Sequence, residues 1–166
     1  MHAFDTTQHL VKYNSAEEIL QAHFQVRLEG YQARKKFLLD SMTKEHTISR
    51  NRARFVDELS TGKIEMTNAG RPQPRQYLVK ALHEGGYDLV EDAGGDLSYK
   101  YLLSLPIDSL VADESQRLQE AAASLGEKLE TLRNTPPEQM WMDDLDVLEK
   151  ELLLDPLFAA GYSPES

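Results

Sequence analysis

The longest periodic segment of the chain, residues 15–59, reads SAEEILQAHFQVRLEGYQARKKFLLDSMTKEHTISRNRARFVDEL. Its apolar side chains recur mostly at steps of three, four or seven residues, which places them on one stripe of an α-helix. The stripe comprises Leu20, Phe24, Leu28, Tyr31, Leu38, Met42, Phe55 and Leu59. The spacing of Ser15 and Glu18 matches a capping box and marks the helix start. At about 1.5 Å per residue such a helix reaches roughly 65 Å and protrudes from a small domain.

The end of this helix is a reversal point. The polar stretch from Thr47 to Arg54 leaves two alternatives for the middle of the helix, a loosened or broken turn or a continuous run to about Leu59, and Ser60-Thr61-Gly62 ends it. Residues Lys63–Thr67 alternate as in a short strand, and Asn68-Ala69-Gly70 follow as a turn. The opening Met1–Tyr13 lacks helical periodicity and predicts an extended segment or a strand and turn.

A compact segment follows the reversal. Pro74 can open a helix through Gln76–His83, with Leu78 and Leu82 on its buried face. Gly85-Gly86 then supplies a C-terminal stop. Further on, residues 99–110 (YKYLLSLPIDSL) are the densest aromatic and aliphatic segment of the chain, so packing against something is expected there.

Two more helical patterns complete the chain. The first has heptad spacing at Leu118, Leu125, Leu129 and Leu132 and is broken by Thr135-Pro136-Pro137. The second carries Trp141, Leu145, Leu148 and Leu152 and ends at Asp155-Pro156. We expect Trp141 to anchor this last helix against the long one, and the tail to Ser166 to be loose.

Charge is distributed unevenly. Residues 1–107 hold 14 acidic and 14 basic side chains, whereas residues 108–166 hold 14 acidic and 4 basic, which accounts for the net charge of -10. Residues 27–54 contain eight basic and three acidic side chains, and residues 113–154 contain four basic and eleven acidic. Antiparallel pairing therefore sets a positive outgoing helix beside a negative returning one, which selects the partner more than it stabilises the fold.

Composition excludes several classes of function. The chain has no cysteine, so disulfides, thiolate catalysis and cysteine-based zinc sites are absent, and it has no apolar run of the roughly 20 residues that a membrane span needs. The net negative charge argues against a nucleic-acid-binding module. The five histidines show no paired metal-ligand spacing, so no metal site is expected. Gly85-Gly86 and Gly94-Gly95 lack the Lys-Ser/Thr of a phosphate-binding loop.

These observations predict a mainly α fold: a long antiparallel helical coiled-coil hairpin with a small α+β globular tip. The expected parts are an extended lead-in, an outgoing arm helix, the tip, the returning helices and a flexible tail, at residues 1–14, 15–59, 60–111, 112–154 and 155–166.

A series of short motifs runs in order along residues 1–154. These stretches are Met1 with Phe4-Asp5, Lys12-Tyr13, Ile19-Leu20, Phe24, Arg27-Leu28, Tyr31, Arg34-Lys35, Leu38-Leu39, Ala53-Arg54-Phe55, Gly62-Lys63-Ile64, Leu78, Leu82, Gly86-Tyr87, Tyr101-Leu102-Leu103, Leu105-Pro106, Thr135-Pro136, Trp141 and Asp144-Leu145. Their order resembles the eukaryotic-type DNA topoisomerase II family, in the region that follows its DNA-cleavage core. The chain departs from the family at Asp108-Ser109 and Val111 and in the short loop before Tyr99. These departures bear on the surface of the tip.

The resemblance implies a mechanical role. In this family the arms project from the cleavage core and their tips meet as the exit gate, or C-gate, which opens to release the transported DNA duplex. We therefore expect the chain to form a homodimer through the tip and to have no membrane partner. We expect an intracellular location, which is the nucleus if the source is eukaryotic. No catalytic residue is expected, because no motif for the nucleophilic tyrosine, the magnesium site or the ATPase is present. ATP and Mg²⁺ are expected to act in the full-length enzyme, and this segment is expected to bind no cofactor.

Two sets of residues are candidates for that role. The self-associating surface is assigned to Tyr99, Tyr101, Leu102, Leu105, Pro106 and Leu110, each of which has packing inside the tip as its alternative. The side chains that could face passing DNA are Arg34, Lys35, Lys36 and Lys44, with pairing to the acidic returning helix as the preferred alternative. The competing function for the whole chain is a stand-alone coiled-coil dimerisation scaffold unrelated to DNA, which explains the heptads but not the ordered tip motifs.

Overall fold

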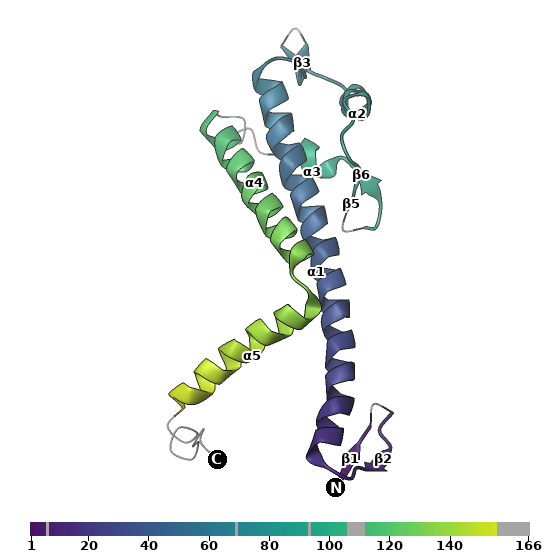
Figure 1. Cartoon of the computed structure of the whole chain (residues 1–166). Helices are drawn as coiled ribbons and strands as arrows, with labels where there is room; N and C mark the ends of the chain where they lie inside the picture. The colour runs from purple at the N-terminus through teal and green to yellow at the C-terminus, as the bar shows by residue number, and fades with distance from the viewer. Residues whose placement is uncertain (6, 69, 93, 106–111, 156–166) are drawn as a thin grey trace. The chain divides into compact units, whose positions relative to one another are not determined.

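The computed structural model describes residues 1–5, 7–68, 70–92, 94–105 and 112–155, and the side chains of residues 112–114 are not among the parts described. The fold is mainly helical, with three small two-stranded sheets (Figure 1). The chain divides into two compact units. We call residues 1–38 with 132–166 the terminal unit, and residues 39–131 the central unit. The helix α1, Ala16–Ser60, contributes its first half to one unit and its second half to the other.

The terminal unit begins with a β-hairpin, as the absence of helical periodicity in Met1–Tyr13 allowed. Strands β1 (His2–Phe4) and β2 (Leu10–Lys12) are antiparallel, with Ala3 opposite Val11. The connection bends at Gln8, whose φ of 64° lies in the left-handed region. The hairpin leads directly into α1.

The start of α1 has the expected cap. The Ser15 hydroxyl accepts a hydrogen bond from the Glu18 amide at 3.2 Å, and the Glu18 carboxylate accepts one from the Asn14 amide at 2.7 Å. The first bond satisfies a donor that the first helical turn leaves free, and the second ties the residue before Ser15 to the same turn. The prediction of a helix beginning at Ser15 is confirmed.

Of the two alternatives for Thr47 to Arg54, the structure has the continuous helix, since α1 runs through this stretch to Ser60. Four polar side chains of this stretch bond to residues 85–101 of the central unit: Arg50, Asn51, Arg52 and Arg54. Asn51 is 2% exposed and donates to the carboxylate of Asp88 and to the hydroxyl of Tyr101. Long-range contacts thus stabilise a stretch that looks weak by local criteria.

The strand expected at Lys63–Thr67 is also displaced. Gly62, with φ of 72°, closes the end of α1, and the amides of Lys63 and Ile64 both donate to the Glu58 carbonyl. This capping holds the backbone of residues 62–64 on the helix end, so it is not available for a strand ladder. Strand β3 (Thr67–Asn68) starts later and pairs with β4 (Arg71–Pro72) around the predicted turn.

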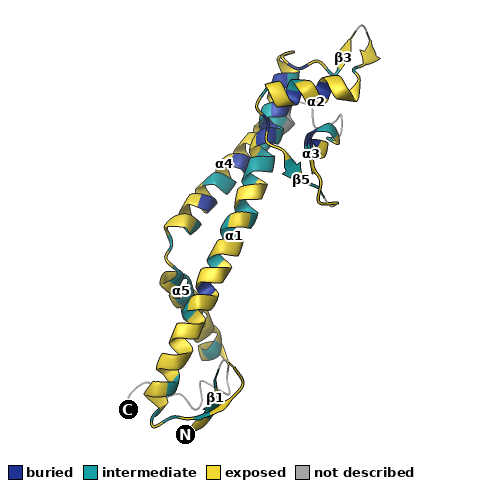
Figure 2. Ribbon diagram, turned by 90° about the vertical axis from the view of Figure 1, so that its right-hand side faces the viewer, coloured by how far each residue is buried: buried dark blue, intermediate teal, exposed yellow. Residues whose placement is uncertain are grey.

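The second predicted helix is confirmed as α2, Arg75–Glu84, which follows Pro74 and ends at Gly85. Leu78 and Leu82 are buried on one face, as expected. Strands β5 (Val90–Glu91) and β6 (Leu97–Ser98) form a third hairpin, and the short helix α3, Lys100–Leu103, follows it. Buried side chains gather where these elements meet the second half of α1 (Figure 2).

The return is made by α4 (Ala112–Asn134) and α5 (Pro137–Leu154). Within the central unit, α4 lies beside α1 and runs antiparallel to it (Figures 1 and 2). A Cβ added at Gly126 would lie 3.3 Å from the His46 ring, which shows how closely the two helices approach. Leu129 is buried on the predicted heptad stripe. Of the predicted tail, residues 155–166, all but Asp155 lie outside the described residues.

In the described part of the chain, no helix combines the length and apolar character needed to cross a membrane.

Candidate functional site

Part of the segment predicted to self-associate belongs to the core of the central unit. Tyr99 is 5% exposed and Leu102 is 1% exposed, and both belong to the hydrophobic cluster of Phe55, Ile64, Leu82, Tyr87, Tyr99 and Leu102. Tyr101 and Leu105 are partly buried against this cluster. Pro106 and Leu110 lie outside the described residues. Packing inside the unit therefore accounts for Tyr99 and Leu102, and the interface assignment remains a prediction.

Tyr101 forms hydrogen bonds within the chain through both its hydroxyl and its backbone carbonyl. Its hydroxyl donates to the Asp88 carbonyl at 2.7 Å and accepts from Asn51 Nδ2 at 2.9 Å. Its carbonyl accepts from Arg52 Nε at 3.3 Å. Burial raises the pKa of the Tyr101 phenol above its ordinary value. The hydroxyl is thus a neutral structural donor that ties α3 to α1.

A buried carboxylate organises the other side of the core. Glu58 is 7% exposed and accepts hydrogen bonds from Arg54 Nε at 3.0 Å, Lys63 Nζ at 2.8 Å and the Tyr87 hydroxyl at 2.8 Å. Burial acts to raise the pKa of Glu58, but the bonds from Lys63, Tyr87 and Arg54 together outweigh it, so this pKa is lowered. Burial and the Glu58 carboxylate raise the pKa of Tyr87. Glu58 is therefore charged and fully paired at neutral pH.

Arg54 connects this network to the end of α2. Its Nη2 donates to the Gly85 carbonyl at 2.6 Å, and its guanidinium carbon lies over the Tyr87 ring. Gly86 adopts a φ of 68°, which a side chain at this position would strain. The motifs Ala53-Arg54-Phe55 and Gly86-Tyr87, far apart in sequence, thus meet in one structural contact.

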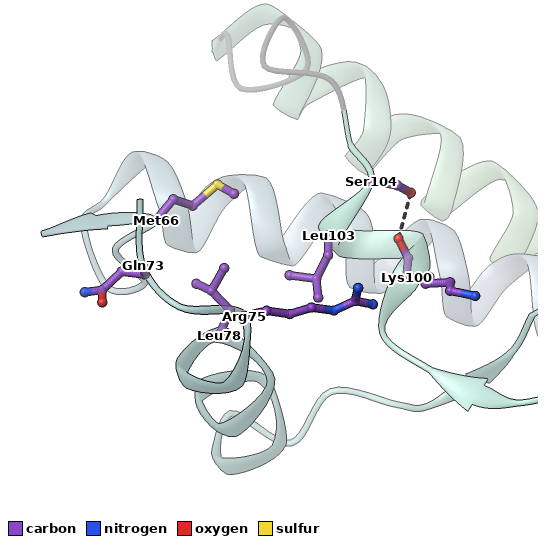
Figure 3. Close-up of a pocket in the computed structure, with 7 residues that line it drawn as sticks. All are labelled: Met66, Gln73, Arg75, Leu78, Lys100, Leu103 and Ser104. Carbon is purple, nitrogen blue, oxygen red and sulfur yellow. Dashed lines mark hydrogen bonds between the residues drawn. The ribbon is translucent and has the colours of Figure 1, made fainter. Parts of the chain in front are cut away.

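The central unit also has a surface pocket of about 300 Å³ beside α2 and α3 (Figure 3). Its lining combines apolar side chains with two cations: Met66, Gln73, Arg75, Leu78, Lys100, Leu103 and Ser104. Lys100 is ion-paired with Asp92, and the Ser104 hydroxyl donates to the Lys100 carbonyl at 2.7 Å. These side chains offer apolar surface, positive charge and hydrogen-bonding groups to a molecule in the pocket. The sequence did not predict this pocket, because its residues come from separate elements.

The four cations predicted to face DNA have different surroundings. Arg34 is ion-paired with Asp144 of α5, which agrees with the alternative that these cations pair with the returning helix. Lys35 donates to the backbone carbonyls of Arg133 and Thr135. Lys44 lies 3.5 Å from Glu91 of the β5–β6 hairpin, and Lys36 is exposed. A DNA-facing role for these residues remains a prediction.

Trp141 packs in the terminal unit as an anchor of α5. Its ring stacks on that of Tyr31 at a centroid distance of 5.9 Å and lies 5.2 Å from that of Phe24. The Tyr31 hydroxyl donates to Asp144 at 2.8 Å. Among the described residues, no three His, Asp or Glu side chains gather in a group that could hold a metal ion.

Comparisons with known proteins give one consistent result. The family model for the A subunit of DNA gyrase/topoisomerase IV matches residues 1–146. DNA topoisomerase 2 of Acanthamoeba polyphaga mimivirus is 29% identical over 147 residues, which is 88% of this chain and 12% of the viral protein. DNA topoisomerase 2-alpha of Cricetulus griseus is 30% identical over 179 residues, which is 92% of this chain and 12% of the relative. The chain thus spans about an eighth of the length of these relatives.

A solved structure agrees with these matches. The DNA-binding, cleavage and re-ligation domain of Plasmodium falciparum topoisomerase II superimposes with a TM-score of 0.74 at 28% identity. The superposition covers 90% of this chain and 23% of that one.

Proposed function

Since the chain belongs to the A-subunit family of DNA gyrase/topoisomerase IV, as a segment of a type IIA DNA topoisomerase, we propose that it forms the coiled-coil arm and exit gate of such an enzyme. In this role it opens to release the transported duplex during strand passage. The observation that supports the proposal best is the extent of the family match, which runs from the β1–β2 hairpin through α1 and the central unit into α5. A dimerisation scaffold unrelated to DNA is not favoured by this match.

The proposed parts follow the elements of the chain. Residues 15–59 and 112–154 are the arm, residues 60–111 are the gate tip, and residues 1–14 lead in from the cleavage core. A gate needs a stiff support and an interface weak enough to open. The hydrogen bonds from Asn51, Arg52 and Arg54 to residues 85–101 support the stiffness of the tip.

Since the core takes up Tyr99 and Leu102, the proposed contact surface rests on the other candidates, Tyr101, Leu105, Pro106 and Leu110. We propose that catalysis belongs to other parts of the enzyme, that ATP and Mg²⁺ act there, and that the location is nuclear for a eukaryotic source.

Sedimentation of the isolated chain tests the gate proposal. We expect a monomer–dimer equilibrium at micromolar concentration, and Leu105→Asp should shift it toward monomer because a charge at a dimer contact is costly to desolvate. The matched control is Leu59→Asp, at another leucine that is partly buried against the same cluster but lies outside the proposed contact surface. A chain that stays monomeric at high micromolar concentration, or an effect of Leu59→Asp as large as that of Leu105→Asp, contradicts the proposal.

A further inference from the structure

The junction between α4 and α5 lies against α1 within the terminal unit. Helix α4 ends at Asn134, and α5 begins at Pro137, with Pro136 as its N-cap residue. Neither proline has an amide hydrogen to continue the helical ladder. The last carbonyls of α4 consequently need donors from elsewhere.

Lys35 of α1 supplies those donors. Its Nζ donates to the Arg133 carbonyl at 2.8 Å and to the Thr135 carbonyl at 2.7 Å, across 98 and 100 residues of sequence. A cation at this position also complements the negative end of the α4 dipole. One side chain thereby holds both the last turn of α4 and the start of the linker.

Asp144 makes the matching contact on the other side of the junction. Its Oδ2 accepts from the Tyr31 hydroxyl at 2.8 Å and pairs with Arg34 Nη1. The hydrogen bond from Tyr31 and, to a smaller extent, the one from Arg34 lower the pKa of Asp144, so the carboxylate is charged at neutral pH. The Trp141 ring packs on Tyr31 in the same turn of α5.

Beyond its first turns, α5 is mostly exposed. No residue of this helix is buried, and Val147, Leu148 and Leu154 are each more than half exposed. Figure 1 shows α5 leaving the junction at an angle to the first half of α1. Among the described residues, the contacts that set this angle are concentrated in the first turns of α5 and at Lys35.

We propose that Lys35 and Asp144 form a two-point latch that fixes the direction of α5 relative to the first half of α1, and that releasing it lets α5 swing about the Thr135-Pro136-Pro137 linker. Neutralising the Lys35 ammonium, for example by acetylation, removes one of the two points. The latch goes beyond the proposed function, since it needs neither a second chain nor DNA.

Distance measurements between paired spin labels test the latch. The chain has no cysteine, so labels at Gln21→Cys and Glu151→Cys, both exposed positions, report on α1 and α5 alone. We expect a narrow distance distribution in the parent chain, and a wider one with a displaced maximum in Lys35→Met and in Asp144→Ala. Lys35→Arg keeps a cationic donor and should retain the narrow distribution. The controls Lys36→Met and Asp146→Ala alter exposed neighbours and should leave it unchanged.

Asp144→Ala could unfold the chain, which a loss of the helical circular dichroism signal would reveal. For that case, hydrogen exchange in Lys35→Gln gives a second measurement. The latch requires faster exchange of the amides in the last turn of α4 and the first turn of α5. The proposal is overturned by unchanged exchange there, by unchanged distances in a folded Lys35→Met Asp144→Ala chain, or by controls that widen the distribution equally. A monomeric chain in sedimentation would refute the gate and leave the latch intact.

Discussion

The guanidinium carbon of Arg54 lies 4.4 Å from the centroid of the Tyr87 ring. The same side chain bonds to Glu58 and to the Gly85 carbonyl, so it joins α1, the end of α2 and the buried carboxylate. Residues 31 positions apart in sequence are thereby held together at the base of the proposed tip.

Arg54→Ala is expected to destabilise the central unit by about 2 kcal/mol, from the loss of a stacked cation and of hydrogen bonds to a charged group. Arg54→Lys should recover only part of this, since an ammonium cannot stack and bond in a fork as a guanidinium does. Urea unfolding followed by circular dichroism measures both. The control Arg71→Ala, on the exposed strand β4, should change the unfolding free energy by less than about 0.5 kcal/mol. Equal effects at both positions would show that Arg54 has no special role.

Local sequence signals predicted the helices well, because the start, the apolar stripe and the end of a helix are set by residues close together in the sequence. The Ser15 cap, the stripe of α1 and the Gly85-Gly86 stop of α2 are all readable within a few positions. The sequence left a break at Thr47–Arg54 open because the contact that satisfies Asn51 is not local: its partner Tyr101 is 50 residues away. By helix propensity alone, polar residues such as Asn51 weaken a helix, and their tertiary partners cannot be seen in the local sequence.

The candidate site was less predictable for a related reason. Hydrophobicity singled out the segment from Tyr99 to Leu110, but it does not distinguish a core side chain such as Leu102 from a contact surface. The bonds from Lys35 to backbone carbonyls leave no side-chain signal at Arg133 or Thr135, because any residue supplies a carbonyl. Charge pairing of α1 with the returning segment correctly anticipated the partner of Arg34, though not which acidic residue it is.

The buried carboxylate of Glu58 predicts how stability depends on pH. Its pKa in the folded chain lies below the ordinary value of 4.5. Its stabilising contribution is therefore fully present above the unfolded-state pKa and is lost as the pH falls through the folded-state pKa. Glu58→Gln should lower the unfolding free energy at pH 7 by roughly 1–3 kcal/mol and should flatten the acid limb of the stability profile.

Urea unfolding at a series of pH values measures this effect. Glu65→Gln, at an exposed glutamate after the end of α1, is the matched control and should leave the acid limb unchanged. An acid limb as steep in Glu58→Gln as in the parent chain would assign the acid sensitivity to other carboxylates.

Two glycines predict opposite responses to alanine. Gly86 has a φ of 68°, so Gly86→Ala forces a side chain into the left-handed region and should cost about 1–2 kcal/mol. Gly30 lies inside α1 with nothing within 4 Å of an added Cβ, so Gly30→Ala should stabilise by about 0.5–1 kcal/mol through helix propensity. Thermal unfolding compares the two. A stabilising Gly86→Ala would mean that the α2 stop does not depend on its left-handed residue.

Gly126 tests the approach of α4 to α1. An added Cβ would lie 3.3 Å from His46 Nε2, tighter than an ordinary contact, so the gain in helix propensity of about 1 kcal/mol is offset by crowding of the imidazole. Gly126→Ala should therefore stabilise less than Gly30→Ala in the parent chain. In a His46→Ala background the crowding is gone, and the full gain should return. A double-mutant cycle on unfolding free energies measures this coupling, expected to be at least about 0.5 kcal/mol for residues in contact. Additive effects of the two substitutions would show that α4 does not pack against α1 at this point in solution.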